Sequence, residues 1–271
     1  RGTRQMSRLQ TVDTATKGSR IGESAIRPDG VPKVKGEFVF SNDLRHPDMI
    51  WGGTLRSPHP SARIVSINTT PALKMTGVYA VLTSEDLDGM PLYGLEHPDQ
   101  PVLADGVVRF QGEPVAIVAA DHPDNVRLAL EAIDVEYELI EPLSDSKLAQ
   151  ENEAIHPDGN LFREININYG NPQEEGEITV EGTYEVGMQD QAPLGTESGM
   201  AVPSEDGGID LFVSTQWLHA DRDQVAACLN LPPEKVRLTL AGVGGAFGAR
   251  EDISLHIHLC LLAMRTGKPI K

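Results

Sequence analysis

The sequence predicts an α+β protein, and its 271 residues are enough for one large domain or two ordinary ones. The strongest observation is a strand, a helix and a strand in succession. Residues 115–119 form a continuous apolar run typical of a buried strand, residues 124–132 have helical spacing, and residues 135–139 alternate like a strand. A second observation is the series of strands after residue 177, which leads into two helical stretches. With 39% hydrophobic residues, the chain can bury a core in which helices and sheets mix.

In chain order, the first half begins with a polar stretch and continues with short strands. Residues 1–30 carry scattered Thr, Ser, Gly and Arg, and we expect an arm that packs loosely. Four strand-like runs follow, the second and third separated by a Pro-rich turn and the fourth closed by a Ser/Asp-capped helical turn. These runs are expected at residues 33–40, 50–55, 63–67 and within 77–87.

A change of composition marks a boundary in the middle of the chain. Residues 144–176 are rich in Asp, Glu, Asn, Pro and Gly, and we place a linker at residues 151–176 within them. Beyond it, the pattern predicts a strand, a hairpin, a helix, a strand and a helix. These elements are expected at residues 177–186, 199–215, 218–230, 236–240 and 252–267. The final residues, KPIK, resemble the start of another strand rather than the natural end of a domain.

The charge and the cysteine content argue against several classes of function. The formal net charge of −17 repels phosphate backbones and anionic membranes, so we expect no nucleic-acid and no membrane partner. No apolar run approaches the roughly 18 residues of a transmembrane helix, and the N-terminus lacks the apolar stretch of a secretory signal. Cys228 and Cys260 are too few for a disulfide framework, which indicates a reducing cytoplasm, and we expect both to be buried.

A glycine-rich stretch between the predicted strand 236–240 and the last predicted helix is the first candidate for a functional site. It contains Gly242, Gly244, Gly245 and Gly248. Such a loop exposes backbone N–H groups beside a helix N-terminus and can hold an anion or an oxygen with partial negative charge. A tight turn without a ligand explains the glycines equally well. A dinucleotide site is disfavoured, because no acidic residue follows about 20 positions later to bind a ribose.

A second candidate lies at residues 214–216, where Ser, Thr and Gln end a strand just before a helix. From such a junction the amide N–H of Gln216 can point toward an acceptor, although a polar turn with a solvent-facing glutamine is the simpler interpretation. His256, His258 and Cys260 suggest a metal site at first sight. They alternate within a helical run, where side chains two residues apart diverge, so we expect no metal site there.

Four stretches of the sequence match motifs of one known family. VSTQ at residues 213–216, followed by GVGGAFGARED at 242–252, is similar in order and spacing to the pair STQ and GGGFGxKE. WGGTLRSPHPSARI at 51–64 and the stretch at 108–138 resemble segments of an a/b hammerhead domain. Together they resemble the large, molybdenum-cofactor-binding subunit of the xanthine dehydrogenase and aldehyde oxidase family.

The resemblance implies an a/b hammerhead domain followed by the start of the first molybdopterin-binding domain, with a mixed sheet and helices. The expected division is an arm at 1–30, the hammerhead domain at 31–150, a linker at 151–176 and the molybdopterin-binding part at 177–271. One stretch departs from the family pattern. At residues 188–199, Gln191 stands in place of a histidine and Gly195 in place of a glutamate, which indicates a diverged branch or a different substrate.

The resemblance also assigns roles to the two candidate stretches. In the family, the Gly-Phe-Gly turn brings backbone N–H groups against an oxygen on molybdenum, and the glutamine amide bonds nearby. The cofactor-binding residues implied here are Gln216, Gly245, Ala246, Phe247 and Gly248. Glu251 matches a glutamate that contacts the heterocycle in purine-oxidising members, and an acid favoured at a helix start is an equal alternative. The pterin holds the metal, so no metal ligand is implied in this chain, and the catalytic glutamate is expected beyond residue 271.

The implied function is an oxidoreductase that hydroxylates a purine or related N-heterocycle with oxygen from water. Iron–sulfur clusters and FAD are expected on partner subunits or segments, because this chain has no cysteine pattern for a cluster, and the full assembly is expected to be oligomeric. The 271-residue chain alone is expected to fold but to lack molybdenum and activity. Two alternatives remain open: an aldehyde-oxidising member of the family, and a non-catalytic scaffold or assembly fragment that retains the hammerhead fold.

Overall fold

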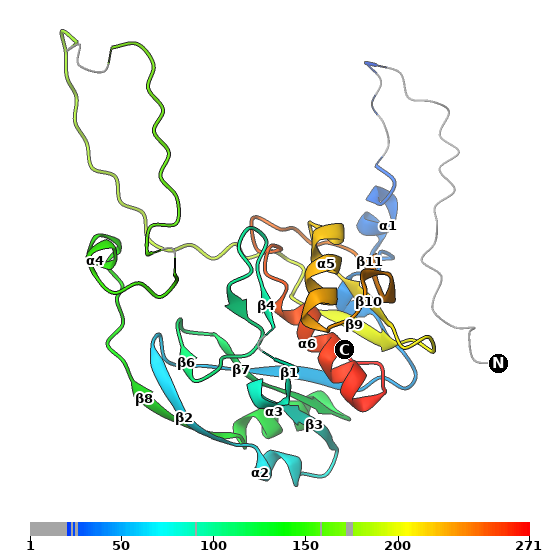
Figure 1. The fold of residues 1–271 in the computed structure, drawn as a ribbon. Coiled ribbons are helices and arrows are strands. Elements are labelled where there is room, and N and C mark those ends of the chain that lie inside the picture. Colours follow the sequence, from blue (N-terminus) through cyan, green and yellow to red (C-terminus); the bar gives the residue numbers. More distant parts are fainter. Residues whose placement is uncertain (1–20, 23, 25–26, 90, 158, 172–175) are drawn as a thin grey trace. The chain divides into compact units, whose positions relative to one another are not determined.

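The computed structural model describes residues 21–22, 24, 27–89, 91–157, 159–171 and 176–271 (Figure 1). The chain divides into two compact units. One joins the residues up to Leu139 with Gln191–Lys271, and the other is Ile140–Asp190. Most of the predicted arm at residues 1–30 lies outside the described residues. Helices and sheets mix in the first unit, which confirms the α+β class.

The first sheet has the strand order β1-β7-β3 and is antiparallel throughout. It consists of β1 (Trp51–Arg56), β7 (Pro114–Ala120) and β3 (Val78–Leu82). Every residue of β7 is buried, because the two faces of this central strand contribute to different core clusters. Ala116 and Val118 pack in the cluster that includes α3 (Pro123–Glu131), and Ile117 and Ala119 pack in the cluster that includes the C-terminal helix. The continuous apolar run therefore has the physical cause that the sequence suggested.

A second sheet has the order β6-β2-β8, from β6 (Val107–Val108), β2 (Ala62–Asn68) and β8 (Asp134–Leu139). The predicted succession of strand, helix and strand is confirmed. The strands before and after α3 in the chain, β7 and β8, however belong to different sheets. Short elements complete this part of the chain. They are α2 (Thr70–Leu73), β4 (Leu92–Tyr93), β5 (Gln100–Pro101) and the 3-10 turns Ser41–Asp43 and Ser84–Asp86.

The third sheet, of order β11-β10-β9, carries the candidate site. The predicted hairpin is confirmed as β9 (Gly199–Pro203) and β10 (Ile209–Val213), and β11 (Val236–Leu240) lies parallel to β10. The connection from β10 to β11 passes through α5 (Leu218–Cys228) and the 3-10 turn Pro233–Lys235.

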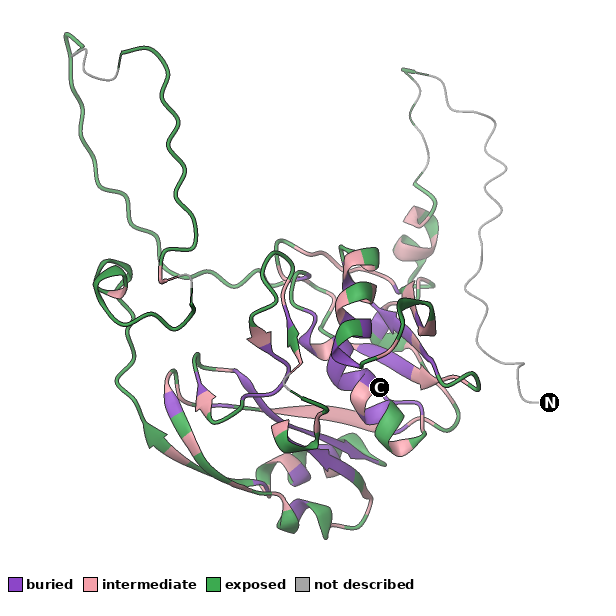
Figure 2. Cartoon of the chain, viewed as in Figure 1, coloured by how far each residue is buried: buried purple, intermediate pink, exposed green. Residues whose placement is uncertain are grey.

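The last helix, α6 (Ser254–Thr266), follows β11 and joins the third sheet to the first. Its residues Ile257, Cys260 and Leu262 are fully buried in the cluster shared by the two sheets (Figure 2). The helix ends at Gly267 in the left-handed conformation, with φ of 65°, as the sequence predicted. Each described helix falls short of the length and apolarity that a membrane span requires.

The backbone around Ile270 links the edges of two sheets. Ile270 exchanges hydrogen bonds of 2.9 Å in both directions with Ala201 of β9. Ile50, just before β1, donates to the carbonyl of Pro269 and accepts from the N–H of Lys271, both at 2.9 Å. The strand predicted at KPIK is thus present as a single bridging residue.

The strand predicted at residues 33–40 is wrong. The structure has α1 (Gly30–Lys35) there, and Gly36 ends it in the left-handed conformation with φ of 70°. The N–H groups of Glu37 and Phe38 both donate to the carbonyl of Pro32, which closes the helix end. Local backbone bonding therefore prevails over the alternation, and of the predicted strand only Phe40 pairs, in an isolated bridge to Gly242.

The strand predicted at residues 177–186 is also wrong. The unit Ile140–Asp190 contains α4 (Ser146–Glu151), and its described residues after 160 belong to no helix or strand. All of these residues are exposed, including Ile178, Val180 and Tyr184 of the alternating pattern (Figure 2). A strand needs a neighbour for its backbone groups and a surface for its apolar face, and among the described residues this segment pairs with neither.

Two histidines of α6 are buried in the core. His258 donates from Nε2 to the carbonyl of Val102 at 3.0 Å, because a carbonyl can only accept, and its Nδ1 then accepts from the hydroxyl of Thr54 at 3.0 Å. Neither ring nitrogen of His256 bonds to a described residue. Burial lowers the pKa of each ring to about 4. Both cysteines are buried as expected, and burial raises the pKa of Cys228 to about 11.

We expect the fold to lose stability as the pH falls from about 6.5 to about 4. The unfolded chain binds protons on His256 and His258 near pH 6.5, whereas the folded chain does so only near pH 4, so acid favours the unfolded state. Two such groups change the free energy of unfolding by up to about 2.7 kcal/mol per pH unit. Urea denaturation at several pH values measures this dependence.

Two variants test this prediction. His256→Leu removes a buried histidine, and the control His219→Leu removes an exposed histidine of α5. Burial raises the pKa of Glu113 and Asp221, and these carboxyls oppose the histidines, so the difference between variants is the informative quantity. The first variant should flatten the pH dependence and the second should not. Equal slopes in both variants would contradict the prediction.

Candidate functional site

The two stretches that the sequence singled out meet at the carboxyl ends of β10 and β11 in the third sheet. β10 and β11 are parallel, with Val213 opposite Leu240 at their carboxyl ends. Residues 214–217 follow β10 and lead into α5, and the glycine-rich loop follows β11 and leads toward α6. Ligands of open sheets with parallel strands bind at such carboxyl ends, so the topology supports a site here.

Short hydrogen bonds fasten the two strand ends to each other. The N–H of Ala241 donates to the carbonyl of Val213 at 2.8 Å, and the buried hydroxyl of Ser214 donates to the carbonyl of Gly242 at 2.7 Å. Thr215 donates to the carboxyl of Asp221 in α5, whose pKa burial raises. The next residue, Gln216, is exposed, and its amide bonds to no described residue.

The glycines of the loop serve both a sharp turn and close packing. A side chain at Gly244 would place its Cβ 2.4 Å from the backbone nitrogen of Gly195, and one at Gly242 would come 2.4 Å from the ring of Phe38. Gly245 and Gly248 have φ of 105° and 87°, where other residues are strained. The close approach at Gly242 and Gly244 is therefore to the protein itself.

The segment that departs from the family pattern packs directly on this loop. The N–H of Gly195 donates to the carbonyl of Gly244 at 3.2 Å. A Cβ at residue 195 would lie 3.0 Å from the backbone nitrogen and Cα of Gly244, so only glycine fits comfortably. The replacement of a glutamate by Gly195 thus has a steric reason in this chain.

Arg250 holds the loop against that segment from below the surface. Its side chain is 1% exposed and donates to the carboxylate of Glu197, to the carbonyl of Gly195 and, at 3.4 Å, to the carbonyl of Gly245. Burial raises the pKa of Glu197, although Arg250 acts in the opposite sense. Glu197 and Arg250 are 53 residues apart, so no spacing rule connects them and this clamp cannot be predicted from the sequence.

Replacing Arg250 by methionine should destabilise the fold by about 1–3 kcal/mol, since the carbonyls and Glu197 lose a charged donor in a partly buried place. Chemical denaturation followed by circular dichroism measures the change. Arg222→Met is the matched control, because Arg222 pairs with Asp223 on the surface and should cost less than about 0.5 kcal/mol. Equal costs in the two variants would exclude the clamp.

A second contact joins the two candidate stretches beyond the carboxyl ends of β10 and β11. The indole Nε1–H of Trp217, next to Gln216, donates to Oε2 of Glu251 at the end of the loop. Glu251 is exposed, and the indole is 46% exposed. The family resemblance assigns a role to Glu251, whereas no sequence pattern points to Trp217.

The loop presents backbone N–H groups at the surface. The backbone N–H groups of Ala246, Phe247 and Gly248 donate to no other described residue, and the Phe247 side chain is 75% exposed. Such donors on an exposed turn can bond a group with partial negative charge. Among the described residues, no cluster of His, Cys, Asp and Glu could hold a metal ion directly.

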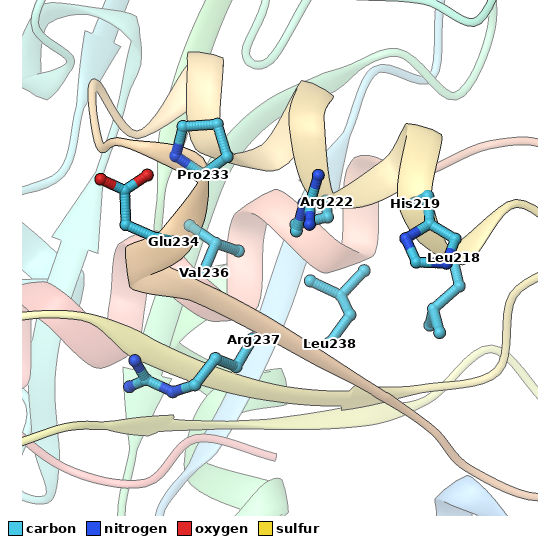
Figure 3. Close-up of a pocket in the computed structure, with 8 residues that line it drawn as sticks. All are labelled: Leu218, His219, Arg222, Pro233, Glu234, Val236, Arg237 and Leu238. Atoms are coloured by element: carbon cyan, nitrogen blue, oxygen red, sulfur yellow. The ribbon is translucent and has the colours of Figure 1, made fainter.

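A shallow pocket on the neighbouring surface contains none of the predicted site residues. It has a volume of about 280 Å³ and lies between α5 and β11 (Figure 3). Its lining residues are Leu218, His219, Arg222, Pro233, Glu234, Val236, Arg237 and Leu238.

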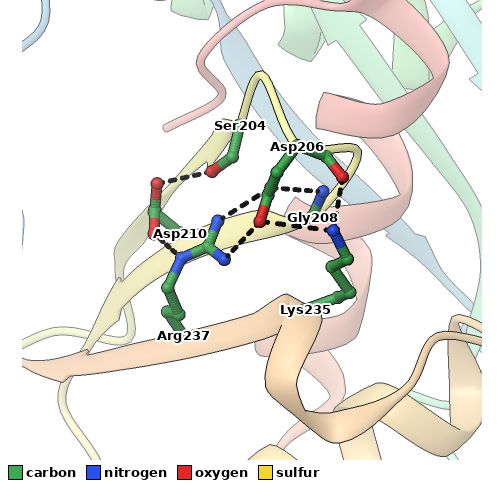
Figure 4. A network of polar contacts seen from close by, with 6 residues as sticks. All are labelled: Ser204, Asp206, Gly208, Asp210, Lys235 and Arg237. Atoms are coloured by element: carbon green, nitrogen blue, oxygen red, sulfur yellow. Dashed lines mark hydrogen bonds and ion pairs between the residues drawn. The ribbon is translucent and has the colours of Figure 1, made fainter.

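The polar network beside this pocket stabilises the sheet. Arg237 bonds Asp210 at 2.6 Å and Asp206 at 3.1 Å, and Lys235 bonds Asp206 at 3.4 Å (Figure 4). The backbone N–H of Gly208 and the guanidinium of Arg237 lower the pKa of Asp206 to about 2. The network ties the β9–β10 hairpin to β11 and pairs the charges of Arg237 and Lys235 with those of Asp206 and Asp210.

Two successive parts of the chain each match a known domain family. Residues 35–141 match the aldehyde oxidase and xanthine dehydrogenase a/b hammerhead domain, and residues 155–271 match the molybdopterin cofactor-binding domain. The chain is 38% identical over 253 residues to a probable xanthine dehydrogenase subunit of Bacillus subtilis. It is 36% identical over 256 residues to the nicotinate dehydrogenase large molybdopterin subunit of Eubacterium barkeri. These matches cover 92% and 93% of this chain but only 34% and 60% of the two relatives.

Solved structures show the same architecture. The aldehyde oxidoreductase of Desulfovibrio gigas superposes with a TM-score of 0.79 at 26% identity, over 90% of this chain and 29% of that one. The quinoline 2-oxidoreductase of Pseudomonas putida superposes with a TM-score of 0.77 at 28% identity, over 94% of this chain and 34% of that one. The chain thus spans about a third of each solved relative.

Proposed function

The chain belongs to the xanthine dehydrogenase and aldehyde oxidase family, and we propose that it forms the N-terminal part of a molybdopterin-binding subunit that hydroxylates a purine or related N-heterocycle. The observation that carries this proposal is the exposed carboxylate of Glu251 at the end of a loop whose N–H groups at residues 246–248 bond to no described residue. A carboxylate accepts a hydrogen bond from a ring N–H, which an aldehyde lacks. The name of one relative supports such a substrate, since xanthine carries ring N–H groups. The ring nitrogens of nicotinate and quinoline carry no hydrogen, and these names support only the broader class of aromatic N-heterocycles.

We assign the molybdenum–molybdopterin cofactor to the carboxyl ends of β10 and β11 in the third sheet. Its binding residues in this chain are Gln216, Gly245, Ala246, Phe247 and Gly248. The cofactor supplies a two-electron oxidation with water as the source of oxygen. The chain's own contribution is to donate hydrogen bonds from the loop and from the Gln216 amide to oxygen that gains negative charge, and to orient the heterocycle with Glu251.

The proposed domains are the arm at 1–30, the hammerhead domain at 31–150, a linker at 151–176 and the molybdopterin-binding part at 177–271. The family matches at 35–141 and 155–271 support two successive domains. The length of the relatives supports a larger subunit, since they extend well beyond the region that they share with this chain.

We further propose a cytoplasmic, oligomeric assembly in which partner subunits or other segments carry iron–sulfur clusters and FAD. A cluster bound by protein thiolates needs about four cysteines, and this chain has two, both buried. The net charge of −17 argues against a nucleic-acid or membrane partner.

Steady-state assays of the assembled enzyme with xanthine, nicotinate and a benzaldehyde test the proposed substrate class. We expect kcat/KM to be greater for a heterocycle than for the aldehyde. A preference for the aldehyde would favour the aldehyde-oxidising alternative, and an assembly without molybdenum by elemental analysis would favour a scaffold. The 271-residue chain purified alone is expected to be folded without molybdenum, and stoichiometric metal in it would contradict this part of the proposal.

A further inference from the structure

We propose that Trp217 is a positioning residue that fixes the carboxylate of Glu251 and thereby sets the preference of the site for substrates with a ring N–H. This inference rests on the proposed function, because it concerns the group that recognises the heterocycle. The observation behind it is the hydrogen bond from the indole Nε1–H of Trp217 to Oε2 of Glu251.

The contact occupies one carboxylate oxygen and leaves the other available. Oε2 of Glu251 accepts from the indole, and Oε1 accepts from no described residue. An indole N–H can only donate, so Trp217 cannot compete with the carboxylate as an acceptor for the substrate. The pair therefore presents one oriented acceptor to a ligand.

Trp217 is held at its backbone and Glu251 by the anchoring of its neighbour, while both side chains stay exposed. The carbonyl of Trp217 accepts from the N–H of Asp221 at 2.9 Å in the first turn of α5, and its own N–H donates to the hydroxyl of Thr215 at 3.4 Å. On the other side, Glu251 follows the buried Arg250, which clamps the loop. The hydrogen bond thus joins two anchored segments.

A fixed carboxylate binds its substrate better than a mobile one. A free glutamate samples many rotamers, and a substrate that bonds it must order the side chain and lose part of the binding free energy. Trp217 orders Glu251 before the substrate arrives. Because an aldehyde makes no bond to Glu251, this benefit is confined to substrates with a ring N–H.

The first test is a spectrum of the chain labelled with nitrogen-15, which does not depend on turnover. The chain has two tryptophans, Trp51 and Trp217, so two indole N–H signals are expected. Glu251→Val should move the Trp217 signal upfield, because the indole loses its charged acceptor, and should leave the Trp51 signal in place. A Trp217 signal that does not move would overturn the contact.

The second test is a double-mutant cycle in the assembled enzyme. Trp217→Phe keeps a ring but removes the donor, and it should raise KM for xanthine about tenfold while KM for benzaldehyde stays unchanged. In the Glu251→Val background the same substitution should have no further effect on xanthine, since Trp217 acts through Glu251. A rise in KM for both substrates, or an effect that persists without Glu251, would overturn the positioning role.

The two tests separate this inference from the proposed function. If the wild-type assembly oxidises only aldehydes, the proposed function and the specificity role both fail, and the spectrum still decides whether the contact exists. If the assembly oxidises xanthine and Trp217→Phe changes nothing, the proposed function stands and only the role of Trp217 fails.

Discussion

Replacing Glu251 by valine in the assembled enzyme should lower kcat/KM for a purine, relative to that for an aldehyde, by well over about tenfold. A site built to accept a hydrogen bond discriminates strongly once that acceptor is lost, because the donor on the substrate is then desolvated without a partner. Aldehydes should be oxidised no worse than by the wild type. The quantity to measure is the ratio of the two kcat/KM values in wild type and variant.

The competing role for Glu251, an acid at a helix start, predicts a different result. It would cost a few tenths to about 1 kcal/mol of stability and leave the ratio alone. In the structure, Asp252 already fills that role, since its Oδ1 accepts from the N–H of Ser254 at 2.7 Å. Glu136→Val is a matched control, because Glu136 is an exposed carboxylate with a single bond, to Ser66, in β8. A ratio that moves equally in both variants would refute the substrate role.

The substitution Gln216→Ala should lower turnover of the assembled enzyme by about 10²–10³-fold, the usual loss when a donor aimed at developing negative charge is removed. The amide is exposed at the carboxyl edge of β10 and bonds to no described residue, so it is free for such a role. For the same reason the free energy of unfolding should change by less than about 0.5 kcal/mol. Single-turnover kinetics and urea denaturation of the same preparation measure the two effects.

Gln111→Ala provides the comparison for this variant, because Gln111 is an exposed glutamine in a turn of the hammerhead region. It should change neither turnover nor stability. Wild-type turnover in Gln216→Ala would mean that this glutamine merely faces solvent, the simpler interpretation of the sequence.

The sequence predicted the elements whose pattern reflects their own burial. β7 was predictable because both its faces are covered, and the β9–β10 hairpin because its turn residues interrupt two apolar runs. The assignment of β7 and β8 to different sheets was not predictable, since periodicity does not identify a strand's neighbour. The failures at residues 33–40 and 177–186 have the same origin, because alternation describes a strand only where a partner exists.

The residues of the candidate site were likewise predictable only in part. Gln216 and the glycine loop could be found, since each stands at the end of a strand and before a helix. Trp217 was invisible as a partner of Glu251, 34 residues away, because an exposed tryptophan carries no local signal. The role of Gly244 was understood only partly, because the surface that it approaches is the backbone of Gly195.

The bridge at Ile270 has a consequence for biosynthesis. Ile50 and Ala201 reach their shared neighbour only after Ile270 has left the ribosome. At about 5–20 residues per second, the roughly 220 residues from Ile50 to Ile270 take some 10–45 s to be made. The end of β1 lacks this partner throughout that interval, and the edge of β9 lacks it while the roughly 70 residues from Ala201 to Ile270 are made, so each is open for a time to pairing with other nascent chains. The hammerhead region therefore gains this protection against aggregation only once Ile270 has emerged, and chaperones that shield unpaired strand edges are most useful to it before then.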